Sequence, residues 1–173
     1  MLITEGCLMT EDARNLPGEQ LRRAMRHWVT GVAIVASAHE GVQHGMTVNS
    51  FVSVSLEPPM VTVTLANDTR THQLVRESGW FGVTILNAEQ QHLAEVFAGR
   101  VPDGGNRFAG VPTYTLLSRA PLIEDGLAGL DCRVVYRHVM PRSTLFLARV
   151  EGVRVSEGGQ PLVYHNRTWF TLK

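Results

Sequence analysis

Alternating apolar and polar positions run through the first half of the chain and predict β-strands. Val32 to Val35 is a short apolar run that leads into the turn-like sequence His39-Glu40-Gly41. Gly45 to Leu56 alternates until Glu57-Pro58-Pro59 interrupts it, and Met60 to Leu65 alternates again. Because side chains along a strand point to opposite faces with a period of two, we expect each stretch to turn one face toward a core.

Three segments have helical spacing instead. In Glu19 to Trp28 the arginines take one side, and the other side carries apolar residues at i, i+4 and i+7, Leu21, Met25 and Trp28. This spacing predicts an amphipathic helix. A second helix is expected from Arg70 to Glu77. A third is expected to begin at Asn87 as its N-cap and to turn three apolar side chains inward, those of Leu93, Val96 and Phe97.

The second half of the chain returns to strands. Trp80 to Leu86 is predicted as a strand, and the glycine-rich stretch Arg100 to Gly110 is predicted as a loop. Glu157-Gly158-Gly159 is typical of a hairpin turn. Further β-rich stretches are Leu127 to Arg137, Thr144 to Val155, Pro161 to Tyr164 and Thr168 to Leu172. Because strands outnumber helices and turns recur at short intervals, we expect a mainly β fold, a closed or partly closed antiparallel barrel with a few flanking helices.

Composition indicates one folded domain with part of its surface covered. We expect residues 18–173 to form this domain behind a flexible tail at residues 1–17. Charged residues make up 18% of the chain, below the usual ~25%, which favours a surface covered by a partner or a second copy. Sixteen basic residues balance sixteen acidic ones, and no Lys/Arg run occurs. The charge therefore argues against binding to nucleic acid or to a membrane surface.

Cysteine use and the N-terminal sequence predict a cytoplasmic protein. Cys7 and Cys132 provide neither a disulfide framework nor a metal or redox motif, and Cys132 is expected to be inert packing in a strand. The start of the chain lacks a signal-peptide pattern, and the longest apolar runs are far below the ~18 residues needed to cross a bilayer. The sequence motifs of zinc proteases, dinucleotide-binding βαβ units, P-loops and serine-hydrolase elbows are absent, and no metal site is predicted.

Two polar stretches are candidate binding sites. The period of two places one set of side chains together on the first long strand, Thr47, Asn49, Phe51, Ser53 and Ser55. Thr62 and Thr64 form the polar side of the next strand. Neutral donors and acceptors beside backbone N–H groups suit the ring edge, ribityl chain and phosphate of a flavin. The alternative is an ordinary solvent-facing surface, where Ser and Thr are common.

The second stretch, Ala66 to Thr71, leads from a strand into a helix. Hydroxyls, backbone N–H groups, the positive end of the helix dipole and Arg70 meet there, which favours a phosphate site. The alternative is that Thr69 only caps the helix.

The order of these motifs resembles the short-chain flavin reductases that serve two-component flavin-dependent monooxygenases. The resemblance extends from Leu21 to Leu172 through LRRAMRHWVTGVAIVAS, HGMTVNSFVSVSLEPPMVTVTL, NDTRTHQL, WFGVTILNAEQQHLAEVFAGR, NRFAG, DCRVVYR and PLVYHNRTWF. Its most specific part is GMTVNSFVSVSLEPP. The resemblance implies a split β-barrel of the FMN-binding type and a homodimer. It also implies FMN or FAD exchanged as a substrate, NADH or NADPH as hydride donor, and a monooxygenase that receives reduced flavin by diffusion.

The resemblance further implies which residues bind the flavin. Those matching positions along the isoalloxazine and ribityl are Thr47, Val48, Asn49 and Ser50, with Ser53 and Ser55 on the same stretch. Those matching ribityl and phosphate contacts are Ala66, Asn67 and Thr71. Those matching the segment that closes over the cofactor are Phe97, Arg107 and Phe108.

The chain departs from the family pattern at Pro141, Arg142 and Ser143, where the family usually has Gly-Asp-His. That His is associated with the nicotinamide site, so the change bears on nucleotide binding more than on flavin binding. Arg142 suits a phosphate of the nucleotide or of FAD, or it is simply an exposed arginine. His138 is a further candidate for part of the missing role.

The leading hypothesis is an NAD(P)H:flavin oxidoreductase that supplies reduced flavin to a partner monooxygenase. Hydride transfer between stacked rings needs orientation rather than an acid or base, so no side chain is predicted as a proton donor or acceptor. One alternative is a flavin-binding electron-transfer protein without nicotinamide-dependent reductase activity. Another is an oxidase of the pyridoxamine-phosphate type. The sequence leaves open FMN or FAD, NADH or NADPH, and the identity of the partner.

Overall fold

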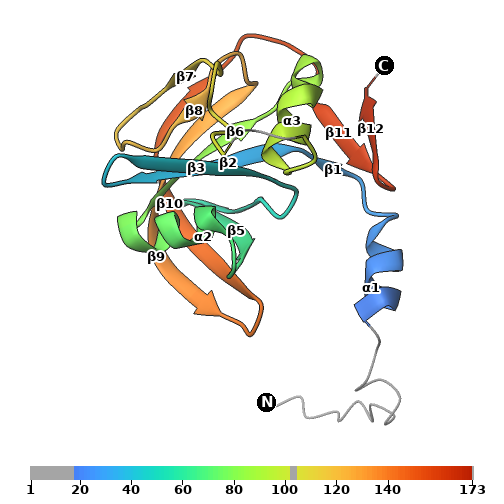
Figure 1. Cartoon of the computed structure of the whole chain (residues 1–173), viewed down its shortest axis with the longest axis horizontal. Coiled ribbons are helices and arrows are strands. Elements are labelled where there is room, and N and C mark those ends of the chain that lie inside the picture. The colour runs from blue at the N-terminus through green and yellow to red at the C-terminus, as the bar shows by residue number, and fades with distance from the viewer. Residues whose placement is uncertain (1–17, 102–104, 173) are drawn as a thin grey trace.

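A computed structural model describes residues 18–101 and 105–172, so the expected tail at residues 1–17 and Cys7 lie outside the described residues (Figure 1). The largest sheet contains, in spatial order, β3 (Val42–Val48), β2 (Ala33–His39), β6 (Trp80–Ile85), β9 (Ala128–Val139), β10 (Ser143–Val155), β5 (Pro59–Ala66) and β4 (Val52–Leu56). A second sheet contains β1 (Thr30–Gly31), β11 (Leu162–His165) and β12 (Thr168–Thr171), and a small pair contains β7 (Thr113–Tyr114) and β8 (Leu122–Ile123). The helices are α1 (Gly18–Met25), α2 (Arg70–Ser78), the 3-10 turn η2 (Ala88–Gln90) and α3 (Gln91–Phe97). The expectation of a mainly β fold with a few flanking helices is confirmed.

The largest sheet curls because its two edge strands are neighbours in the chain. β3 and β4 lie at opposite ends of the seven-stranded order, yet only residues 49–51 join them. Four Cα-to-Cα steps span at most about 14 Å, so the two edges must approach each other. They do not pair, since each has only one strand partner among the described residues. The sheet is therefore a barrel split between β3 and β4.

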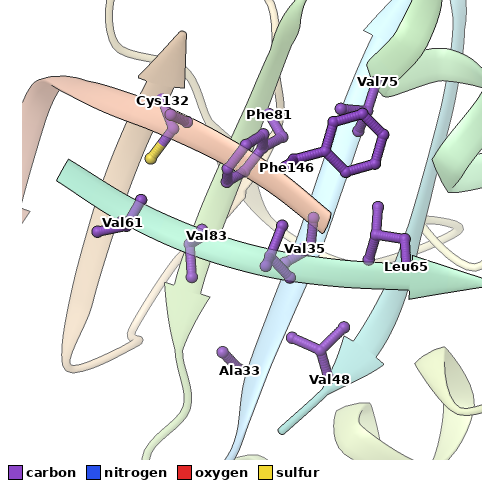
Figure 2. Packing of buried hydrophobic residues seen from close by; sticks show 12 residues of the cluster. Ala33, Val35, Val48, Val61, Leu65, Val75, Phe81, Val83, Cys132 and Phe146 are labelled. Carbon is purple, nitrogen blue, oxygen red and sulfur yellow. The ribbon is translucent and has the colours of Figure 1, made fainter. Parts of the chain in front are cut away.

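The interior of the split barrel is filled by apolar side chains from six of its strands. Figure 2 shows Phe81 of β6, Phe146 of β10 and Cys132 of β9 packed among the valines of β2, β3, β5 and β6. Val75 of α2 belongs to the same cluster and is 1% exposed. This helix therefore closes one end of the barrel, which explains why its apolar residues Leu74 and Val75 are buried.

A second apolar cluster covers the outer face of β2 beneath α3. It combines Val32, Ile34 and Ala36 with Leu93, Ala94 and Phe97 of α3. Both faces of β2 are thus buried, which gives a reason for the continuous apolar run at its start. As expected, Asn87 caps the turn before α3, accepting hydrogen bonds from the backbone N–H groups of Glu89 and Gln90.

The predicted strand from Gly45 to Leu56 is wrong, because the chain breaks at residues 49–51 into β3 and β4. The expected common polar face is also wrong. Val52 pairs with Thr62 and Ser53 pairs with Val61, so Val52 and not Ser53 shares a face with the threonines of β5, and after a bulge Ser55 pairs with Met60. β4 is an edge strand, and its Val52, Val54 and Leu56 are 56%, 55% and 82% exposed. Alternation alone cannot tell a strand beside a core from an edge strand.

Two other local predictions need correction. Glu157-Gly158-Gly159 does not form a hairpin turn, because the flanking strands β10 and β11 belong to different sheets. The amphipathic helix ends at Met25 instead of Trp28, and none of its residues is buried. Figure 1 shows α1 standing apart from the sheets, and its apolar side chains Leu21 and Met25 stay exposed among the described residues. The predicted helix at Arg70 to Glu77 is confirmed as α2.

No helix among the described residues is long and apolar enough to cross a membrane.

Cys132 is confirmed as a buried packing residue. It is 0% exposed, and burial, together with the adjacent Asp131 charge, raises the pKa of its thiol to about 12. Since the thiolate is the reactive form, we expect a Cys7→Ser variant to react with a thiol reagent at pH 8 at least about 100-fold more slowly when folded than in urea. Absorbance of the released reporter measures the rate. Equal rates in the two states would contradict the buried position of Cys132.

Candidate functional site

β3 carries predicted site residues on two opposite faces. Thr47 lies on the face under α3, where its hydroxyl donates a hydrogen bond to the Ala94 carbonyl at 2.6 Å. Val48 lies on the other face, 7% exposed within the barrel core. These two predicted residues therefore cannot present their side chains to one ligand. What they share is the outer edge of β3, which no strand covers among the described residues.

The direction of the backbone along this edge follows from Arg107. Its guanidinium donates from Nη1 to the carbonyl oxygens of Gly45, at 3.0 Å, and Phe97, at 2.9 Å. The Gly45 carbonyl therefore points away from β2. Because backbone orientation alternates along a strand, the N–H and C=O of Thr47 also point outward at the edge. Thr47 thus offers one backbone donor and one backbone acceptor there, next to the exposed side chain of Asn49.

Phe97, Arg107 and Phe108 hold the α3 side of this edge together. The rings of Phe97 and Phe108 meet edge to face with centroids 4.9 Å apart, and the side chains are 0% and 6% exposed. Gly45 lets them pack against β3, because a Cβ at this position would lie 2.9 Å from Phe97 Cε1. In this structure the two predicted cofactor residues Phe97 and Phe108 are part of the second apolar cluster, while Arg107 ties their loop to β3.

α2 forms the other side of the edge. Thr71 is 0% exposed, and its hydroxyl lies 2.8 Å from Nδ1 of His44 on β3. Thr69 caps the helix, accepting from the His72 backbone N–H at 3.3 Å and donating to the Ala66 carbonyl at 2.8 Å. Thr69 is therefore the N-cap of α2. The positive end of the helix dipole and the backbone N–H groups at the start of α2 suit an anion.

Ser50, in the connection between β3 and β4, forms a side-chain bridge to β5. Its hydroxyl donates to the Thr64 carbonyl at 2.9 Å and accepts from the Thr64 N–H at 3.4 Å. One side chain thus replaces part of a strand partner for β5. Ser53 is exposed and Ser55 half-buried on β4, and neither forms part of the bridge.

Asn67 joins the turn before α2 to the turn between β9 and β10, which are far apart in the sequence. Its Nδ2 donates to the Met140 carbonyl at 2.9 Å, and its backbone N–H donates to the Arg142 carbonyl at 3.1 Å. Ser143 pairs with Ala66 at the start of β10. The turn that carries the Pro-Arg-Ser departure is therefore attached to the turn before α2. Arg142 itself is exposed.

His138 lies on β9 opposite Leu145. Since side chains alternate, His138, Leu145 and Ser143 lie on one face of the β9–β10 hairpin. His138 is exposed and Ser143 half-buried. The hairpin therefore brings a histidine to the face that carries Ser143, although from the opposite strand.

Two adjoining cavities open beside Asn49. One, of about 160 Å³, lies under α3 and the second sheet, and the other, of about 300 Å³, lies toward β4. Both are lined by Val32, Val48 and Asn49. Their walls are mainly apolar, with a few polar groups and Arg100 in the smaller one, which is typical of sites for planar ring systems.

A larger cavity of about 590 Å³ lies on the far side of the turn before α3. Its lining includes Arg107 but also Glu89, Glu124 and Asp125. Three carboxylates disfavour an anionic ligand such as a flavin phosphate. The chemistry therefore favours the pair of cavities at Asn49.

The protein-family comparison identifies the architecture. The model of the flavin reductase like domain matches residues 25–173. The chain belongs to this family. The resemblance noted from the sequence motifs is thus confirmed.

Individual members of the flavin reductase family match most of the chain. It is 37% identical over 146 residues to the NADH-dependent flavin reductase StyB of Pseudomonas fluorescens, covering 83% of each chain. Among solved structures, the styrene monooxygenase flavin reductase of Pseudomonas putida S12 is 33% identical with a TM-score of 0.78, covering 89% of this chain and 97% of the other. The NADH:FAD oxidoreductase SgcE6 of Streptomyces globisporus C-1027, in complex with NAD and FAD fragments, is 28% identical with a TM-score of 0.82, covering 97% and 98%.

Three residues of this flavin reductase fold were not predicted as site residues, although they line the smaller cavity. Tyr164 and Trp169 face each other across β11 and β12 with rings 4.8 Å apart, and Arg100 lies 5.5 Å over the Trp169 ring. Arg100 also donates to the Tyr164 hydroxyl at 3.2 Å. The signal available in the sequence for these residues was an aromatic pair, Tyr164 and Trp169, on either side of the turn between β11 and β12. Its position beside β3 is set by the tertiary fold.

Among the described residues, no three His, Cys, Asp or Glu side chains gather closely enough to hold a metal ion.

The close packing of Gly45 can be tested by adding one methyl group. We expect Gly45→Ala to lower the free energy of unfolding by about 1–3 kcal/mol, because Phe97 is buried and cannot move away freely. Chemical denaturation measures the change. Gly31→Ala is the matched control, since nothing lies within 4 Å of its added Cβ, and should change stability by less than about 0.5 kcal/mol. A Gly45→Ala protein as stable as this control would refute the packing argument.

Proposed function

We propose that this protein is an NADH-dependent flavin reductase that reduces FMN or FAD and releases the reduced flavin to a monooxygenase. The observation that carries the proposal is the outward backbone edge of β3 at Thr47, next to Asn49 and the two cavities that share this residue. Family membership supports the same activity.

The groups at this edge match the needs of a flavin. The polar rim of the isoalloxazine carries both N–H and C=O groups, and the backbone of Thr47 offers their complements. The apolar walls contributed by Val32 and Val48 suit the flat ring faces. The first turn of α2, near Thr71, accommodates the phosphate, with Arg70 exposed beside it. The other proposed flavin contacts are Ser50, Ser53, Ser55, Ala66 and Asn67, whereas Phe97, Arg107 and Phe108 are proposed to act on the flavin site by holding the edge of β3 in place.

The β9–β10 turn is the proposed nucleotide site. A bound flavin accepts hydride directly from the nicotinamide. The protein therefore has to bind and orient the two rings and keep water from their contact face. Arg142 offers a forked, permanently charged donor for a nucleotide phosphate. Ser143 and His138, on one face of the hairpin, line the position of the usual histidine.

Anaerobic mixing with NADH and excess FMN or FAD tests the activity. We expect loss of flavin absorbance near 450 nm together with NADH oxidation, and re-oxidation when air is admitted. A protein that binds flavin but bleaches it with neither NADH nor NADPH would instead be an electron-transfer or flavin-holding protein. Peroxide formed from an amine substrate without nucleotide would indicate the pyridoxamine-phosphate oxidase type. Either result would refute the proposal.

The protein is also proposed to be a homodimer, located in the cytoplasm as its cysteine use predicts. The dimer is supported by the apolar surface that stays exposed at β4 and around α1. Trp28 and Val29, after α1, are 66% and 57% exposed and line the cavity that also contains Val52 of β4. An apolar edge strand that stays exposed invites aggregation unless another chain covers it. A second copy covering this surface would also wall the cavity beside Asn49.

A charge placed on this surface tests the dimer. We expect Val54→Glu to shift the protein from dimer to monomer in analytical ultracentrifugation, because a dimer would bury the new carboxylate unpaired. Leu117→Glu is the control, since Leu117 is 70% exposed in the loop between β7 and β8 and should leave the mass unchanged. A wild-type protein that is monomeric at micromolar concentration would refute the proposed dimer.

A further inference from the structure

A chain of hydrogen bonds runs from α2 through β10 to the β9–β10 turn. Nε2 of His72 lies 3.0 Å from the Thr144 hydroxyl, and that hydroxyl donates to Oδ1 of Asn67 at 2.7 Å. Nδ2 of Asn67 then donates to the Met140 carbonyl at 2.9 Å. The chain links two segments that are distant in the sequence, residues 67–72 and residues 140–144.

The direction of each hydrogen bond is determined from the carbonyl end. A carbonyl can only accept, so the amide of Asn67 must turn its nitrogen toward Met140 and its oxygen toward Thr144. Thr144 has a single hydroxyl proton, which it gives to Asn67. His72 must therefore donate from Nε2, which assigns the Nε2–H tautomer to a neutral ring.

The surroundings of His72 hold its ring neutral and in place. The side chain is 4% exposed, and its ring packs against Phe146 with centroids 5.5 Å apart. Burial first, and then the charges of Arg76 on α2 and Arg137 on β9, lower its pKa below the usual value. Thr144 is 1% exposed. The donor and its first acceptor are thus both shielded from competing water.

We propose that His72 is a positioning residue for the reductase reaction. Through Thr144 and Asn67 it fixes the position of the turn at residues 140–143 relative to the turn before α2, where the flavin phosphate is proposed to bind. This inference rests on the proposed function, because it takes the turn at residues 140–143 to be the nucleotide site. The backbone bond from Asn67 N–H to the Arg142 carbonyl, and that from Met140 N–H to the Ser143 carbonyl at 2.8 Å, complete the attachment. This chain lacks Gly-Asp-His, and the buried side chains of His72 and Thr144 hold the turn in position through Asn67.

Paired variants separate the hydrogen bonds from the space they occupy. Thr144→Val keeps the shape of the side chain and removes the hydroxyl, whereas Thr144→Ser keeps the hydroxyl. His72→Phe fills the site without a donor, whereas His72→Gln supplies an amide N–H at a similar reach. Gln73→Ala, an exposed neighbour on α2 outside the chain of bonds, is the control for general effects of helix substitution.

We expect Thr144→Val and His72→Phe to raise the KM for NADH roughly tenfold, because a loosened turn has to be ordered when the nucleotide binds, which weakens binding. The dissociation constant for flavin, measured by fluorescence without nucleotide, should change much less than the KM for NADH, because Asn67 keeps its bond to the Met140 carbonyl. The Ser and Gln variants should recover most of the wild-type KM, a recovery that packing alone does not explain. An unchanged KM in folded Thr144→Val and His72→Phe proteins would overturn the inference, and so would an equal loss in the Ser and Gln variants.

Amide hydrogen exchange of the ligand-free protein tests the attachment without relying on activity. The amides of Met140, Arg142 and Ser143 should exchange faster in Thr144→Val than in Thr144→Ser, while the β6 amides stay protected in both. The same rate in both variants would overturn the inference even if the wild-type enzyme is active. Conversely, if the wild-type protein oxidises no NADH, the proposed function fails, and the exchange result still decides whether His72 and Thr144 position the turn.

Discussion

The short connection between β3 and β4 is the constraint on which the rest of the structure depends. Three residues join strands that lie at opposite edges of a seven-stranded sheet, so the sheet has to curl until those edges are close. The curl encloses the apolar cluster around Phe81 and Phe146 and leaves a split between β3 and β4, beside the connection from which Ser50 binds β5. The uncovered edge of β3 is a direct result, because β4 arrives beside it without pairing. Fold and candidate binding site therefore have one origin.

An open strand edge gives this flavin reductase fold a neutral binding surface. Backbone N–H and C=O groups bind without a charge, which agrees with a chain whose acidic and basic residues balance. The side chains around Thr47 mostly stabilise the strand. Phe97 and Phe108 pack on it, and Arg107 donates hydrogen bonds to the carbonyl oxygens of Gly45 and Phe97. Many residues that resemble flavin contacts in sequence thus hold the edge in position. The exposed Asn49 and the backbone of Thr47 remain to face a ligand.

The residues that replace Gly-Asp-His lie in a turn that is hydrogen-bonded to a distant part of the chain. Arg142 and Ser143 lie in a turn attached through Asn67 to the start of α2, and Asn67 is oriented in turn by Thr144 and His72. The proposed flavin and nucleotide segments consequently share one rigid support. Loss of the usual imidazole then changes the contacts available to the nucleotide while leaving the placement of the turn to groups in the core.

The sequence by itself determined most of the local structure. The caps at Thr69 and Asn87, the alternation of Val61, Val63 and Leu65, and the inert Cys132 depend on neighbouring residues or on simple burial, so the pattern predicted them. Motif order was also enough to indicate the family. The tertiary structure alone decided that Gly45 to Leu56 is two strands, that Thr47 and Val48 face different elements, and that Asn67 is bonded to Met140. These features arise when distant segments meet as the sheet curls, and periodicity along one strand carries no information about which element covers each face.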